Sequence, residues 1–181
     1  MLWAACCIGF FGLLRAGEFT SDPADDTQLL LSVADIAVDS RSEPKALTVH
    51  LRHSKTDPFG AGCYIHLGRT YDLLCPVTAL LGYLAVRPPT PGPLFIFEDG
   101  SSLSRPRLIS QLQAALQLAG IPAGSYTGHS FRIGAATAAA QAGLSDSMIQ
   151  SLGRWRSAVF TTYIHPPLER LLGASSAMIR P

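Results

Sequence analysis

The stretch GHSFRIGAATAAAQAGLSDSMIQSLGRWRSAVFTTYIH, residues 128–165, decides how this chain folds and holds most of its reactive side chains. Ser130–Ala142 is rich in Ala and is followed by Gly143, which predicts a helix and its end. Ser145 is a suitable N-cap for a second helix, and Ser157 is suitable for a short third one. The stretch therefore predicts three consecutive helices.

The N-terminal half of the sequence combines a helix with strands. Residues 2–14 are almost entirely apolar, which predicts a buried helix. Residues 29–38 and 45–52 are rich in Leu, Val and Ile, which is typical of strands. Over residues 45–52 apolar and polar side chains alternate as in a half-buried strand, and Cys63–Leu67 is the expected partner strand. The turn-rich SKTDPFGAG, residues 54–62, lies between them, so we expect Lys55 at the mouth of a β-hairpin.

Further elements follow the predicted hairpin. Pro76–Val86 predicts an apolar helix with Pro in its first turn, and the Pro-rich residues 87–93 predict a loop. Leu94–Phe97 is expected to form a short strand, and Ser104–Ala119 a helix capped by its first residue. The order of elements predicts an α+β fold, mostly helical, with a small three-stranded antiparallel sheet. The length predicts a single domain over residues 1–181.

Composition excludes some classes of protein. Hydrophobic residues make up 48% of the chain and charged residues 15%, which excludes a disordered or low-complexity sequence. The formal net charge is +1, but residues 1–40 hold one Arg against six acidic residues, whereas residues 100–165 hold five Arg against one Asp. Because Arg suits bidentate contacts with phosphate, the basic segment is a candidate face for a polyanion. An ordinary solvated surface explains the same charges equally well.

The sequence predicts neither metal ligation nor membrane insertion. Cys6, Cys7, Cys63 and Cys75 have spacings that fit no metal-ligand pair or redox motif, and reduced intracellular thiols explain them most simply. The N-terminal apolar run stops at Arg15, which makes it shorter than the ~20 residues of a membrane span. No basic segment precedes the run, as a signal peptide would require. We therefore expect no cofactor, no metal and no membrane partner.

His129 and Arg132 are the first candidate site residues. They stand three positions apart at the start of a predicted helix, so both side chains lie on one face beside N–H groups that favour anions. This arrangement suits a phosphate, although a surface His beside a salt-bridged Arg is the plainer interpretation. Gly128-His129-Ser130 also resembles a nucleophile elbow, but Arg132 stands where that motif has its last Gly, which disfavours a serine hydrolase.

Two aromatic side chains downstream are the next candidates. Trp155 stands in LGRWRS, and Tyr163 stands late in a predicted short helix. Each has an ordinary interpretation as a packing residue. The Arg side chains nearby and at the start of another predicted helix are candidate contacts for a nucleic-acid backbone. These candidates are Arg105, Arg107, Arg154 and Arg156.

Six positions occur together in an order that resembles a known family. They are Arg15 in LLRAGE, Lys55 at the predicted hairpin, His129 and Arg132, Trp155 in LGRWRS, and Tyr163 in TTYIH. Over about residues 3–168, the chain thereby resembles the catalytic domain of tyrosine recombinases, the integrase family of phages, Xer-type resolution systems and eukaryotic mobile elements. The Trp in place of a second His is most similar to crypton-like elements of eukaryotes.

The resemblance implies DNA strand cleavage and rejoining, as in site-specific recombination or integration. Tyr163 would attack a DNA phosphodiester, forming a 3′-phosphotyrosyl link and freeing a 5′-hydroxyl. His129 would accept the phenolic proton, and Lys55 would protonate the leaving oxygen. Arg15 and Arg132 would clamp the two non-bridging oxygens in the transition state.

The resemblance leaves one position ambiguous and gives one neighbour a role. Trp155 would donate its indole N–H to the phosphate. However, Arg154 lies nine residues before Tyr163 and Trp155 lies eight before it, so either residue can occupy the position of the second His. Glu18, three residues after Arg15, is expected to orient that Arg rather than act on the substrate.

The implied biology and the alternatives to it remain open at this point. The family usually carries an N-terminal DNA-clamping domain, whereas this sequence is expected to begin inside the catalytic domain, as a fragment or shortened derivative. The near-neutral charge favours an alternative, a domesticated DNA-binding module that has lost recombination activity. An unrelated soluble protein is the third hypothesis. The implied partner is double-stranded DNA bound by a homo-oligomer, in the nucleus of a eukaryote, which is favoured, or otherwise in the cytoplasm or nucleoid.

Overall fold

The computed structural model describes residues 1–22, 30–54, 57, 60–164, 172 and 178 of the chain. Within these residues the fold is α+β and mostly helical, with one three-stranded antiparallel sheet, as the sequence predicts. Lys55 lies outside the described residues. None of the helices that the structure describes is both long enough and apolar enough to cross a membrane.

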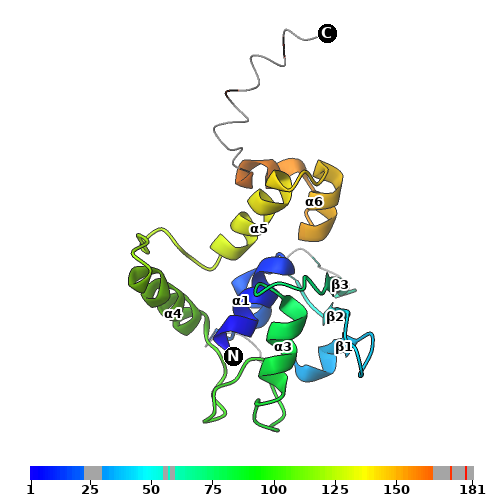
Figure 1. Cartoon of the computed structure of the whole chain (residues 1–181), viewed down its shortest axis with the longest axis vertical. Helices are drawn as coiled ribbons and strands as arrows, with labels where there is room; N and C mark the ends of the chain where they lie inside the picture. The colour runs from blue at the N-terminus through cyan, green and yellow to red at the C-terminus, as the bar shows by residue number, and fades with distance from the viewer. Residues whose placement is uncertain (23–29, 55–56, 58–59, 165–171, 173–177, 179–181) are drawn as a thin grey trace.

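The sheet forms one side of the body of the molecule (Figure 1). Its strands are β1 (Ile36–Val38), β2 (Ala46–Leu51) and β3 (Cys63–Gly68), in that order, and a short 3-10 helix, η2 (Val33–Asp35), leads into the first. The register places Val49 of β2 opposite Ile36 on one side and Ile65 on the other. Every second residue of β2 is buried, which confirms the alternating pattern of the sequence.

The first helices share one hydrophobic core with the sheet. α1 (Leu2–Phe11) packs between α3 (Pro76–Leu84) and the later helix α5 (Ser130–Gln141), and α3 also contacts β3. α1 ends earlier than the predicted helix over residues 2–14, because Leu13 has a φ of 47° and turns the chain into the short α2 (Ala16–Phe19). This turn matters because it brings Arg15 close to the N-terminal end of α5, where His129 and Arg132 lie.

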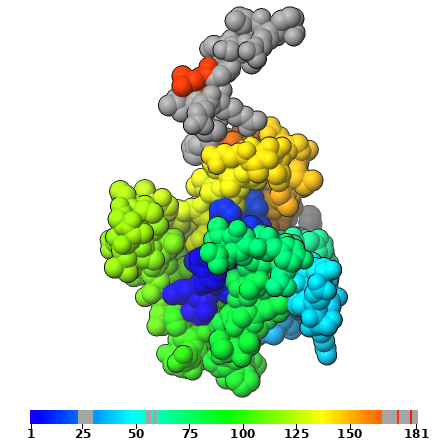
Figure 2. All heavy atoms as spheres, in the orientation of Figure 1, coloured from blue at the N-terminus to red at the C-terminus, as the bar shows by residue number. Residues whose placement is uncertain are grey.

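α4 (Arg105–Leu118) begins as predicted, with the Ser104 hydroxyl accepting a hydrogen bond from the Arg107 N–H. Its one fully buried side chain is Leu108, which joins the main core. The rest of the helix projects from the side of the body, as the yellow-green lobe in Figure 2 shows. The helix therefore exposes most of its length.

A second layer of helices lies beside α1, above the body in Figure 1. It consists of α5, α6 (Asp146–Gly153) and the 3-10 helix η3 (Ala158–Tyr163), which contact one another. Ser145 caps α6 as the sequence predicts, with its hydroxyl accepting from the Met148 N–H. This layer carries His129, Arg132, Trp155 and Tyr163.

One local prediction is wrong. The sequence predicts a strand at Leu94–Phe97, but within this segment the structure has a single isolated bridge, between Ile96 and Ser102. Side chains occupy the carbonyls that a strand would offer to a neighbour: the Tyr83 hydroxyl donates to the carbonyls of Leu94 and Ile96, and the Arg87 guanidinium also donates to that of Leu94. The backbone is satisfied without a fourth strand.

Candidate active site

A pocket of about 210 Å³ opens where the α1–α2 turn meets the helical layer. It is lined by Arg15, His129, Arg132, Ile133, Arg154, Trp155, Arg156, Ser157, Val159 and Tyr163. Five of the six predicted catalytic residues are in this set, and the sixth, Lys55, lies outside the described residues. These five come from the N-cap of α2, the first turn of α5, and the segment from the end of α6 to η3. Three segments distant in sequence thus meet at one cavity.

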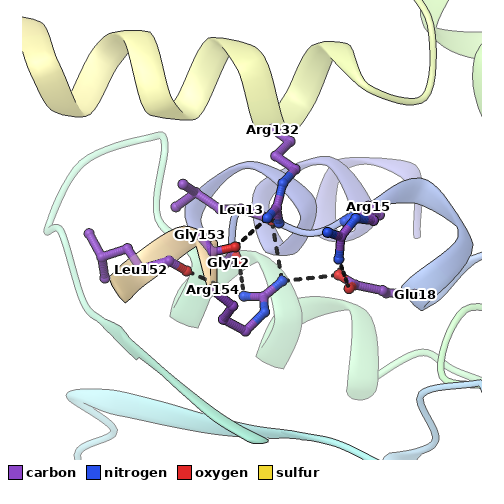
Figure 3. A network of polar contacts seen from close by, with 8 residues as sticks. All are labelled: Gly12, Leu13, Arg15, Glu18, Arg132, Leu152, Gly153 and Arg154. Carbon is purple, nitrogen blue, oxygen red and sulfur yellow. Dashed lines mark hydrogen bonds and ion pairs between the residues drawn. The ribbon is translucent and has the colours of Figure 1, made fainter. Parts of the chain in front are cut away.

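Arg132 forms the floor of the pocket, in the first turn of α5. The residue is only 4% exposed, and its guanidinium donates hydrogen bonds to the carbonyl oxygens of Leu13 and Gly153, as Figure 3 shows. Burial, together with the neighbouring charges of Arg15 and Arg154, lowers the pKa of Arg132 to about 10. The group therefore remains cationic at neutral pH. A guanidinium has five N–H donors, so Arg132 retains donors for an anion.

Arg15 stands at the N-cap of α2 and is held there by Glu18. The Arg15 backbone N–H donates to Glu18 Oε2 (2.9 Å), and its Nη1 donates to Oε1 (3.1 Å). The Glu18 side chain is 5% exposed and that of Arg15 21% exposed. The carboxylate is thus inside the protein and the guanidinium reaches the pocket, which is the orienting role expected for Glu18.

Trp155 forms one wall of the pocket, and its ring covers the guanidinium of Arg132. The Arg132 Cζ lies 4.2 Å from the ring centroid, an arrangement typical of a cation–π contact. The ring also lies against Gly153, because a Cβ at that glycine would overlap it. Trp155 therefore packs directly against Arg132, while the choice between Trp155 and Arg154 for the position of the second His stays a prediction.

Arg154 lies in the same wall, but its guanidinium points into the protein. It reaches across to the α1–α2 turn, where it donates to the carbonyls of Gly12 (3.0 Å) and Leu13 (3.3 Å) and to Glu18 Oε2 (3.0 Å), as drawn in Figure 3. These contacts occupy both terminal nitrogens. They differ from the contacts expected of a residue that binds a DNA backbone.

Tyr163 ends η3 at the mouth of the pocket. Its ring centroid lies 6.0 Å from that of Trp155. Its carbonyl oxygen accepts a hydrogen bond from the Thr137 hydroxyl (2.7 Å), which joins η3 to α5. The same helix therefore carries Arg132 and the anchor for the candidate nucleophile. The sequence motifs do not indicate Thr137, although a hydroxyl within the Ala-rich run is a usable signal.

His129 and Arg156 line this pocket, whereas Arg105 and Arg107 lie outside its lining. His129 is exposed at the N-cap of α5, on the pocket rim, and Arg156 is exposed on the same rim. Arg105 lies against Gly128, where its Nε would be 3.2 Å from an added Cβ. Arg107 stacks on Phe97, with 3.5 Å between its Cζ and the ring centroid. Arg105 and Arg156 thus flank the pocket, whereas the guanidinium of Arg107 lies against the Phe97 ring.

A second pocket adjoins the first and shares Arg154 and Arg156 with it. The other lining residues come from the predicted hairpin: Leu51, Ser54, Asp57, Ala61, Gly62 and Cys63. Among the described residues, no three side chains of His, Cys, Asp or Glu are grouped as metal ligands require.

Comparisons with known proteins relate this geometry to a known fold. No protein-family model matches the sequence, and no curated protein matches it. Among solved structures, the XerH site-specific recombinase bound to palindromic difH substrate superposes with a TM-score of 0.71 at 19% identity, over 98% of this chain and 45% of that one. The XerA recombinase gives 0.71 at 18% identity, over 98% and 56%.

A third similar structure belongs to a mobile element. The Tn1549 transposon integrase in complex with circular intermediate DNA superposes with a TM-score of 0.54 at 17% identity, over 98% of this chain and 57% of that one. The chain thus spans about half the length of the recombinases it matches. At these identities the likeness establishes the fold. The chain has the fold of a tyrosine recombinase.

Proposed function

We propose that this chain is the catalytic domain of a tyrosine-type recombinase or integrase that cleaves and rejoins DNA through a 3′-phosphotyrosyl intermediate. The observation that carries the proposal is the convergence of Arg15, His129, Arg132, Trp155 and Tyr163 on one pocket. A stable fold does not require these five side chains to meet there. Covalent cleavage of a phosphodiester uses each of them: cations and an N–H donor for the phosphate, a proton acceptor, and a phenol as nucleophile.

The charge of the pocket suits a DNA phosphate. Three guanidiniums, those of Arg15, Arg132 and Arg154, lie close enough to influence one another, and the nearby carboxylate is that of Glu18. The local excess of positive charge is fixed before substrate arrives. Such preorganised cations stabilise the additional negative charge of a pentacoordinate phosphorus more than they stabilise the ground state.

The chemistry is a pair of balanced transesterifications. Tyr163 Oη attacks phosphorus, its proton passes to His129, and the P–O5′ bond breaks as a proton from Lys55 reaches the O5′. The Trp155 indole N–H supports a non-bridging oxygen. Attack by a 5′-hydroxyl on the phosphotyrosyl bond then reverses the step, so that no metal or nucleotide cofactor is consumed.

The setting of this reaction follows from the same proposal. The substrate is double-stranded DNA, and a homo-oligomer assembles on it, because rejoining of exchanged strands needs a second active site. The neighbours in complex with DNA support duplex binding. The Trp at position 155 supports a crypton-like mobile element of a eukaryote, and hence the nucleus. Arg105 and Arg156, which flank the pocket, are the proposed contacts for adjoining phosphates.

A domesticated DNA-binding module is the second candidate. The net charge of +1 favours the module over the enzyme. Strong DNA binders usually carry a clear cationic excess, so a chain without one is expected to bind duplexes only weakly. This module would have the same fold and would bind duplex DNA without forming a covalent bond. Covalent chemistry therefore separates the two candidates.

The test begins by selecting bound duplexes from a randomised library at low salt. The selected sequences are then rebuilt as nicked duplexes, in which the short 5′-hydroxyl fragment diffuses away after cleavage. We expect a denaturant-resistant protein–DNA adduct that Tyr163→Phe abolishes while DNA binding persists. Arg132→Ala is expected to slow adduct formation by about 10²–10³-fold.

The possible outcomes separate the candidate functions. Binding without an adduct would establish the module and overturn the proposed chemistry. An adduct that survives in Tyr163→Phe would identify another nucleophile, with Tyr64 and Tyr126 tested next. Binding to no duplex at low salt would exclude both candidates. Binding that weakens steeply with added salt is expected for either one, because phosphate contacts release counterions.

A further inference from the structure

Arg154 has an unusual backbone for its residue type. It follows α6 with a φ of 57° and a ψ of 37°, in the left-handed region where glycine is normally preferred at a helix C-terminus. In addition, its Nε is buried and has no hydrogen-bond partner among the described residues. Both features oppose stability. A glycine would satisfy the same backbone turn at less cost, so the side chain needs another explanation.

The side chain of Arg154 connects two segments that are distant in sequence. Its Nη1 donates to the carbonyl of Gly12 and its Nη2 to that of Leu13, so it holds the α1–α2 turn against the end of α6. The Leu13 carbonyl also accepts from Arg132. Arg154 and Arg132 therefore share an acceptor at the turn that leads directly into Arg15.

The Glu18 carboxylate links Arg154 to Arg15. One oxygen, Oε1, accepts from Arg15 Nη1, while the other, Oε2, accepts from the Arg15 backbone N–H and from Arg154 Nη2. The carboxylate is buried, so its orientation depends on these donors rather than on water. Because Arg154 and the Arg15 backbone N–H together hold Oε2, Oε1 binds Arg15 by a single side-chain bond, which leaves further donors of Arg15 for the pocket.

We propose that Arg154 is a positioning residue that acts on the phosphate through Glu18 and Arg15. This inference rests on the proposed function and adds a residue that binds no substrate itself. Without Arg154, Oε2 keeps only the backbone N–H of Arg15 as a donor, and the carboxylate can turn toward a two-bond contact with the Arg15 guanidinium. That contact would draw the guanidinium of Arg15 away from the pocket. Arg154 thus controls the transition state more than the affinity for DNA.

The experiment is a double-mutant cycle between positions 154 and 15. The substrates are the selected duplexes carrying a 5′-bridging phosphorothiolate, whose thiolate leaves readily and makes slow variants measurable. In the native background, Arg154→Met is expected to slow single-turnover adduct formation by about ten- to a hundredfold, with DNA affinity nearly unchanged. In an Arg15→Ala background, the same change is expected to slow it less than about twofold, because its target is already absent.

Two further variants make the cycle specific. Arg156→Met removes a neighbouring, exposed guanidinium on the pocket rim, and we expect it to weaken DNA binding equally in both backgrounds. Arg154→Lys retains the charge with fewer donors and is expected to recover part of the lost rate. It also replaces Arg154→Met in the cycle if that variant does not fold, as judged by its thermal transition.

The outcomes distinguish this inference from the proposed function. If the native chain forms no adduct, the proposed function fails. If the native chain forms an adduct but Arg154→Met slows the reaction equally in both backgrounds, Arg154 is a structural residue and the inference is wrong. A loss of DNA affinity that accounts for the whole loss of rate would also overturn it. The non-additive result, with partial recovery by Arg154→Lys, would support it.

Discussion

Two clusters of buried hydrophobic residues stabilise the described part of this chain, and different kinds of side chain surround them. The body core, which includes Ile8, Leu14, Leu47, Leu80 and Phe95, is formed by α1, α3 and the sheet and is enclosed by other apolar side chains. The pocket core lies under the candidate active site and is much smaller. It consists of Leu13, Ala135, Ala136, Ile149, Trp155 and Phe160.

The pocket core is bounded on one side by guanidinium groups. Arg132 and Arg154 join the α1–α2 turn to α6 through backbone carbonyls, where the body core uses apolar contact. The consecutive residues Leu13 and Leu14 belong to different clusters, so the boundary falls within one turn. Burying cations costs free energy, as the lowered pKa of Arg132 indicates. Apolar burial is therefore concentrated in the body, and the candidate site lies where the body meets the smaller helical layer.

The largest effect on stability is expected in the body core. Leu80 is fully buried, so Leu80→Ala is expected to destabilise the chain by about 2–5 kcal/mol, measured by urea unfolding. Leu80 does not line the pocket, and the rate of adduct formation per folded molecule should remain unchanged. The control is Leu118→Ala, whose side chain is 91% exposed and whose loss should cost less than about 0.5 kcal/mol. A specific loss of rate in Leu80→Ala would show that the two cores are not separate.

An intermediate effect is expected where the pocket core contacts Trp155. Gly153→Ala places a methyl group where the indole lies, so the ring must move, at a cost of about 1–3 kcal/mol. Because Trp155 covers Arg132, adduct formation should fall by more than the loss of folded protein explains. Fluorescence in a Trp3→Phe background, which leaves Trp155 as the one tryptophan, reports the displacement.

The matched control for Gly153 is a glycine with open space around it. Gly82 lies in α3 and has no atom within 4 Å of an added Cβ, so Gly82→Ala is expected to leave the protein as stable or slightly more stable. Changed fluorescence with an unchanged rate in Gly153→Ala would mean that the ring position is unimportant, which would contradict the role of Trp155 as a wall of the site.

Local signals in the sequence predicted most of the fold. Ser104 and Ser145 cap helices where expected, and the alternation over residues 45–52 corresponds to β2 at Ala46–Leu51. These features depend on neighbouring residues, so the sequence displays them directly. The supposed strand at Leu94–Phe97 failed because its carbonyls are occupied by Tyr83 and Arg87, which no local pattern reveals.

The sequence predicted which residues line the site, but it did not predict the hydrogen bonds that join them to distant parts of the chain. The order of motifs named five residues that the structure places around one pocket, while their catalytic roles stay predictions. The direction of Arg154 was not predictable, because it depends on a left-handed backbone and on carbonyls more than 130 residues away in sequence. The acceptor of Thr137 was equally unpredictable, because it belongs to another element, although the hydroxyl itself stands out in the Ala-rich run. Long-range polar contacts of this kind have no sequence periodicity.

The smallest effect is expected at the contact between α5 and η3. Thr137→Val retains the shape of the side chain but removes the hydroxyl that donates to the Tyr163 carbonyl. The loss of one partly buried hydrogen bond should cost about 1 kcal/mol of stability. Because the bond fixes the backbone of the candidate nucleophile, the adduct-forming rate should fall several-fold on the selected nicked duplexes, while DNA affinity is unchanged. Thr162→Val is the control, since that hydroxyl donates to Val159 within the same turn. If Thr162→Val slows the reaction as much as Thr137→Val does, the joint between α5 and η3 does not position Tyr163, and the helical layer is held by its apolar contacts instead.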